Sequence, residues 1–271
     1  MSMLFDNIFS PHNWETVPFH FWSLVFFVFG SMVGSFLNVC IYRLPLGKSI
    51  VWPASACPHC RRELSWFENI PIASFLALGA RCRTCRARIG WRYPLVEALT
   101  ALLFAFSWWY FGPGMLLVSR LVFGCALIVL FAIDLEHHLL PNVITLPGIV
   151  VGLAFSFFTE PGWMESLIGI AFGGGVLYAI AEAYYRVRRE EGLGMGDVKM
   201  LAMIGAFVGW KLTLVTLMMA SVTGSVIGVL LIITRRGDMK YALPFGTFLA
   251  LGVGAAATIG PGLLAWYLQQ W

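Results

Sequence analysis

The sequence predicts an all-α polytopic membrane protein, with about eight transmembrane helices and a small zinc-binding cytoplasmic loop domain. Of its 271 residues, 59% are hydrophobic and only 12% are charged, whereas a soluble domain has about 25% charged residues. Several apolar runs exceed the roughly 18 residues that indicate a transmembrane helix. The one long polar stretch between such runs holds two C-x2-C pairs.

The apolar runs and the turn residues between them define the candidate spans. The first run has no Asp, Glu, Lys or Arg and is too long for the core of a signal peptide, so we expect a retained helix. Helices are expected throughout, because a backbone in lipid must satisfy its own hydrogen bonds. The eight expected spans are 19–42, 94–111, 115–134, 142–158, 165–185, 197–209, 212–233 and 243–268.

The sixth span is too short to cross a bilayer alone. Residues 197–209 would rise only ~20 Å as a helix, less than the ~30 Å of the hydrocarbon core. We therefore expect neighbouring helices to shelter this segment, or the segment to continue into the seventh span.

The distribution of basic residues predicts the orientation. Half of the 18 lysines and arginines lie within residues 43–92, and most of the others lie within 186–199 and 235–240. Eight spans put these three segments on one face, which the positive-inside rule assigns to the cytoplasm, with both termini outside. The net charge of +4 is then a topology signal, and no nucleic-acid partner is predicted.

The polar loop reads "CPHCRRELSWFENIPIASFLALGARCRTC". Its two C-x2-C pairs supply four thiolates, a ligand set that suits a closed, structural zinc site. Two disulfides or unliganded thiols are the alternatives, and a cytoplasmic face disfavours disulfides because it keeps thiols reduced. The predicted metal ligands are Cys57, Cys60, Cys82 and Cys85.

Two aspartates are predicted to form a catalytic pair. Asp134 ends the third span, and Asp197 follows Gly194-Met195-Gly196 at the start of the sixth. The predicted topology puts both at the cytoplasmic ends of their helices, where ionisable residues are costly and typically functional. Two adjacent carboxyls share a proton, so one can activate water while the other polarises a carbonyl. Asp197 as a helix N-cap and Asp134 in interfacial water are the alternatives.

Other polar residues near span ends are expected to serve structure. We expect Glu97 to pair with Arg92, and Glu182 with a basic residue of the loop that follows it. Lys199 either tunes the pKa of Asp197 or marks the membrane interface, and the sequence does not separate these roles.

Six segments in order carry a resemblance to a known family, the bacterial type IV prepilin peptidases, which are GxGD intramembrane aspartic proteases and N-methyltransferases. The segments are "GSFLNVCIYRLP" (34–45), "CPHC…CRTC" (57–85), "IGWRYPLVE" (89–97), "DLEHHLLPN" (134–142), "GMGDVK" (194–199) and "PFGTFLALG" (244–252).

The resemblance implies a specific function. Asp134 and Asp197 match the two catalytic aspartates, which would cleave the leader of type IV prepilins and type II secretion pseudopilins after a glycine, at the cytoplasmic face of the bacterial inner membrane. The new N-terminal residue would then be methylated with S-adenosylmethionine. The implied organisation is an outer segment with the first helix (1–42), a methyltransferase-associated zinc loop (43–93) and a peptidase core (94–271). No residues are predicted to bind the methyl donor.

Two positions depart from the family pattern. Ala80 stands where the family often has glycine before the third cysteine, which weighs against methyl transfer more than against proteolysis. Thr247 stands where the family block often reads PFGPF, and we expect only a small effect on packing.

Two other classes of function fit part of the pattern. A transporter could use Asp134 and Asp197 in proton coupling, and a broken helix is also a transporter feature. However, no internal repeat is visible. A non-catalytic assembly factor could dock partners through its zinc loop, and it would tolerate substitution of both aspartates.

Overall fold

The computed structural model describes residues 19–190, 194–234 and 244–268. Within these ranges all regular structure is helical, apart from two isolated β-bridges, Ala56 with Glu63 and Arg81 with Arg88. This confirms the predicted fold class. The chain forms two compact units, Met1–Val129 and Leu130–Trp271. The three-part functional organisation stays a prediction.

The first unit is built on a helix pair, α2 (Phe19–Arg43) and α4 (Arg92–Phe111). Glycine on α2 brings the two backbones close, since a Cβ on Gly34 would lie 2.7 Å from the Cα of Glu97. Nearer the start of α2 and the end of α4, the Phe26 ring stacks on Trp108 with 4.7 Å between ring centroids.

The polar loop between α2 and α4 holds three short helical segments, η2 (Leu44–Leu46), η3 (Trp66–Asn69) and α3 (Ala73–Ala77). A capping box starts η3, because the Ser65 amide donates to the buried carboxylate of Glu68 at 2.9 Å. Arg62 binds both oxygens of the same carboxylate, at 2.6 and 2.8 Å. The Ser65 amide and then Arg62 hold the pKa of Glu68 below its usual range.

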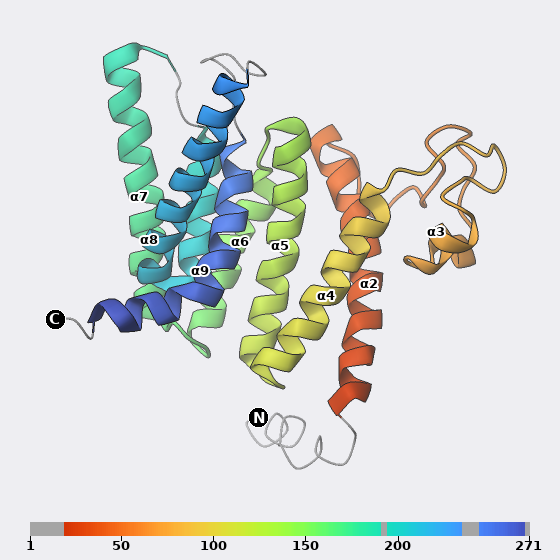
Figure 1. The fold of residues 1–271 in the computed structure, drawn as a ribbon, viewed down its shortest axis with the longest axis horizontal. Helices are drawn as coiled ribbons and strands as arrows, with labels where there is room; N and C mark the ends of the chain where they lie inside the picture. Colours follow the sequence, from red (N-terminus) through yellow and green to blue (C-terminus); the bar gives the residue numbers. More distant parts are fainter. Residues whose placement is uncertain (1–18, 191–193, 235–243, 269–271) are drawn as a thin grey trace. The chain divides into compact units, whose positions relative to one another are not determined.

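The second unit is arranged around α8 (Met195–Ile233), which packs against three other helices (Figure 1). These are α6 (Asn142–Ser156), α7 (Trp163–Arg188) and α9 (Phe245–Leu268). The end of α5 (Met115–His137) also belongs to this unit.

Glycines allow α7 and α8 to meet backbone to backbone. A Cβ on Gly173 would lie 2.6 Å from the carbonyl oxygen of Leu201, and one on Gly205 would overlap the carbonyl group of Gly169. The Ser166 hydroxyl donates to the carbonyl of Ala206 at 2.7 Å, which extends the contact by one turn. Small residues are typical of such contacts between membrane helices.

Gly209 divides α8 into two segments, since its backbone is not helical (φ 74°, ψ 171°). The short first segment is sheltered as expected: Val198 and every residue from Met200 to Gly209 are buried. It also continues through the break into the second segment.

Each of the eight expected spans falls on a helix, with the sixth and seventh forming α8. Five helices are long and apolar enough to cross a membrane, and α6 and Phe245–Thr258 are shorter apolar helices. The start of the eighth span at residue 243 and the basic segment 235–240 lie outside the described residues.

Candidate active site and metal centre

Asp134 lies in the last turn of α5 and is only 4% exposed. Its Oδ2 accepts two hydrogen bonds from Thr247, one from the backbone N–H at 2.6 Å and one from the hydroxyl at 3.0 Å. The alternative in which Asp134 sits in interfacial water is therefore wrong, because this carboxyl is enclosed by protein.

Asp197 is the third residue of α8, and the N-cap of that helix is Gly194. The alternative that Asp197 is itself the N-cap is therefore wrong. The backbone amides of Gly194 and Gly246 instead lie close enough to its half-buried carboxyl to act on it electrostatically, as does Asp134.

The start of α9 connects the two aspartates. The backbone N–H of Thr247 donates to Asp134, and the neighbouring amide of Gly246 lies close enough to Asp197 to act on its carboxyl. The approach requires glycine, because a Cβ on Gly246 would lie 3.0 Å from Oδ2 of Asp134 and 2.9 Å from Leu140. The structure thus brings together the two aspartates singled out in the sequence.

Thr247 is the functional candidate that the sequence reasoning missed. It is buried, and it is the residue that donates both hydrogen bonds to Asp134. These two bonds were not part of the expectation for this position, and the small effect on packing stays a prediction. The segment "PFGTFLALG" was among those that resemble the family, but nothing in its local sequence indicates that Thr247 contacts a residue 113 positions away.

The other polar residues are used structurally. Oε2 of Glu97 accepts the backbone N–H of Ile72 at 2.8 Å, which ties α4 to the polar loop, and the expected pair with Arg92 stays a prediction. Glu182 pairs with Arg186 at 2.8 Å, within α7 rather than in the following loop. Lys199 donates to the side chain of Asn142 at 2.9 Å, linking the starts of α8 and α6.

The four loop cysteines gather into one cluster. Their sulfur atoms all lie within 4.8 Å of one another, and those of Cys57 and Cys85 are 3.8 Å apart. A tetrahedral zinc with bonds of ~2.3 Å has sulfur–sulfur edges of about 3.8 Å. The residues therefore fit a zinc ion, and the spacing leaves no disulfide among them in the structure.

The two halves of the cluster are built alike. In the first, the backbone N–H of Cys57 donates to the carbonyl of Arg62 at 3.0 Å, and the carbonyl of Cys57 accepts from the backbone N–H of Arg61 at 2.9 Å. In the second half, the backbone N–H of Cys82 donates to the carbonyl of Ala87, and the carbonyl of Cys82 accepts from the backbone N–H of Arg86. The backbone amides of Cys85 and Thr84 lower the pKa of the Cys82 thiol to about 6.

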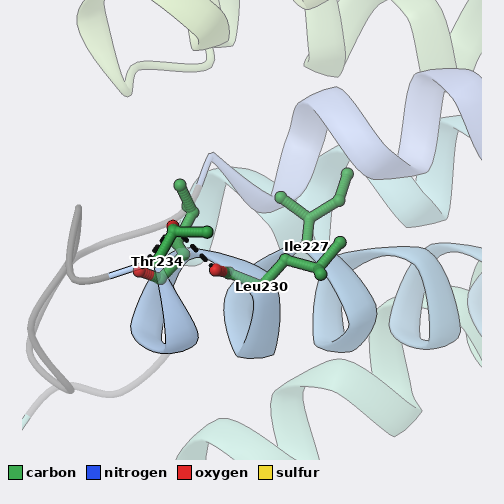
Figure 2. Close-up of a pocket in the computed structure, with 4 residues that line it drawn as sticks. Ile227, Leu230 and Thr234 are labelled. Carbon is green, nitrogen blue, oxygen red and sulfur yellow. Dashed lines mark hydrogen bonds between the residues drawn. The ribbon is translucent and has the colours of Figure 1, made fainter.

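A pocket at the C-terminal end of α8 lies apart from these candidates in the sequence. It is lined by Ile227, Leu230, Leu231 and Thr234 (Figure 2). The Thr234 hydroxyl donates to the carbonyls of Leu230 and Leu231, at 2.8 and 3.2 Å. The one polar side chain of this pocket is thus bonded to its own helix, and we assign the pocket no chemistry.

Comparison with known proteins decides the family. The Bacterial Peptidase A24 N-terminal domain matches residues 28–111, and the Type IV leader peptidase family matches residues 121–229. The chain belongs to the type IV leader peptidase family. It is therefore a multi-pass membrane protein of a peptidase family, and the predicted enzyme class is confirmed.

Named relatives extend over nearly the whole chain. A prepilin leader peptidase/N-methyltransferase of Pseudomonas aeruginosa is 37% identical, over 89% of this chain and 91% of the relative. One of Aeromonas hydrophila is also 37% identical, over 94% of this chain and 96% of the relative. No solved structure matches the chain.

Proposed function

We propose that this chain is an intramembrane aspartic endopeptidase whose catalytic residues are Asp134 and Asp197. Its substrates are type IV prepilins and type II secretion pseudopilins, cleaved after a glycine at the cytoplasmic face of the bacterial inner membrane. The observation that carries the proposal is the proximity of the two carboxyls at the start of α9, where Thr247 binds Asp134 and Asp134 lies close enough to act on Asp197.

The two carboxyls supply what peptide hydrolysis needs when they share one proton. The ionised group takes a proton from water as the water oxygen attacks the peptide carbonyl, and the protonated group gives its proton to the carbonyl oxygen. The diol then collapses as one of its hydroxyl protons returns to the dyad. The C–N bond breaks, and the other carboxyl protonates the leaving nitrogen. The dyad ends with a single proton, ready for another turnover.

We further propose that the new N-terminal amine is methylated, as the names of the relatives indicate for those proteins. S-adenosylmethionine would supply the methyl group, and we assign no residue to hold it. The four-cysteine cluster would hold a structural zinc that fixes the polar loop, since a closed set of four thiolates leaves no coordination position open for substrate.

The test uses the purified full chain in lipid nanodiscs with a synthetic prepilin peptide that includes the leader and the start of the apolar helix. Mass spectrometry reports cleavage, and a second arm with S-adenosylmethionine reports a methyl increment. We expect Asp134→Asn and Asp197→Asn each to abolish cleavage without loss of the folded protein. Glu182→Gln, which removes a partly exposed carboxylate, should cleave normally. Cleavage at the normal rate by either asparagine variant would refute the catalytic assignment.

A further inference from the structure

Thr247 makes the two carboxyls of the candidate dyad inequivalent. Both of its donors, the backbone N–H and the hydroxyl, bond the same oxygen, Oδ2 of Asp134. A carboxylate oxygen has two lone pairs for hydrogen bonds. Oδ2 is therefore fully occupied, and it has no lone pair left for a proton or for water.

The contact is fixed rather than loose. Asp134 is 4% exposed and Thr247 is 5% exposed, so water does not compete for these bonds. The backbone donor lies in the first turn of α9, where N–H groups have no partner within the helix. The preceding Gly246 lets this turn approach Oδ2 to the observed distance.

We propose that Thr247 is a positioning residue that holds Asp134 by Oδ2, so that Asp134 acts on water and substrate through Oδ1 alone. This inference rests on the proposed peptidase function and assigns geometry within its dyad. A proline at this position would have neither a backbone N–H nor a hydroxyl, and so could make neither bond.

The test separates positioning from packing by comparing three variants in the nanodisc cleavage assay. Thr247→Val keeps the shape and the backbone donor but loses the hydroxyl, and Thr247→Ser keeps both donors. A misplacement of ~1 Å can lower a catalytic rate about 100-fold. With one of two bonds lost, we expect Thr247→Val to lower kcat about tenfold with KM unchanged, and Thr247→Ser to stay near the wild-type rate.

Thr247→Ala provides a second chain without the hydroxyl should the valine variant not fold. Rates are measured well below the Tm of each variant, so that lost stability does not appear as lost rate. A normal kcat in the folded variants without the hydroxyl overturns the inference, as does a rise in KM alone or an equal loss in Thr247→Ser. Absence of cleavage by the unmodified chain would instead refute the proposed function.

Discussion

Gly209→Ala is the substitution whose effect the fold predicts most directly. The φ of 74° and ψ of 171° at Gly209 lie in a region that is essentially restricted to glycine, and a side chain held there costs about 1–3 kcal/mol. The new Cβ would also lie 3.0 Å from Cβ of Pro161 and 3.1 Å from its Cγ. Alanine also reduces the conformational entropy of the unfolded chain, which stabilises the fold by about 0.4–1 kcal/mol and offsets part of this cost. The net expected loss of stability is about 1–2 kcal/mol.

The matched control is Gly175→Ala on α7. Gly175 lies within a regular helix, and a Cβ built there has no neighbouring atom within 4 Å. Alanine is favoured over glycine by about 0.5–1 kcal/mol in a helix interior, so this variant should be at least as stable as the wild type.

Unfolding in mixed micelles, followed by far-ultraviolet circular dichroism as the SDS fraction rises, measures both variants against the wild type. Gly209→Ala should unfold at lower SDS and Gly175→Ala should not. If both variants unfolded at the same SDS fraction as the wild type, a non-helical Gly209 would be contradicted. The first segment of α8 would then be a regular continuation of the second.

Three further predictions concern the polar loop. The purified protein should contain about one zinc per chain by elemental analysis. Changing both Cys57 and Cys60 to serine should remove the zinc, whereas Cys125→Ala should not. Metal-free protein with normal activity would exclude the zinc site. Glu68→Gln should lower the Tm at pH 7, because a carboxyl whose pKa is lowered by folding stabilises the fold at pH values above its ordinary pKa of about 4.3. The difference in Tm from the wild type should shrink as the pH falls below that value. A difference that stays constant with pH would contradict the argument. Ala80→Gly should raise stability by about 0.5–1 kcal/mol, because Ala80 has a φ of 57°, whereas Ala87→Gly, at a position without positive φ, should lower it, both measured as Tm.

The elements that the sequence predicts well are those set by lipid or by metal chemistry. An apolar segment in a bilayer must be helical, so each helix that the structure describes in the second unit carries at least one predicted span. Cys57 and Cys82 each begin a C-x2-C pair, and such pairs predict a shared site because a tetrahedral metal needs four ligands. In both cases one physical constraint acts on a short stretch of chain.

The contacts that the sequence does not predict join distant segments. For Glu97 the sequence indicated Arg92, five residues before it, and not the amide of Ile72 in the polar loop, which Glu97 accepts. No pattern of charges indicates this partner, since the donor is a backbone group that every residue except proline has.

The start of α9 shows that a partial signal for such contacts does exist. Gly196 directly precedes Asp197, and Gly246 directly precedes the residue that binds Asp134. A Cβ on either glycine would lie 2.9 Å from Leu140, so both segments approach the same side chain as closely as the backbone allows. Gly246 lets the start of α9 reach the buried carboxyl of Asp134, and Gly196 lets the start of α8 approach Leu140. In an apolar chain, a glycine beside an acid and a second glycine at the start of another helix are therefore candidates for a shared site, even when no side chain marks the second segment.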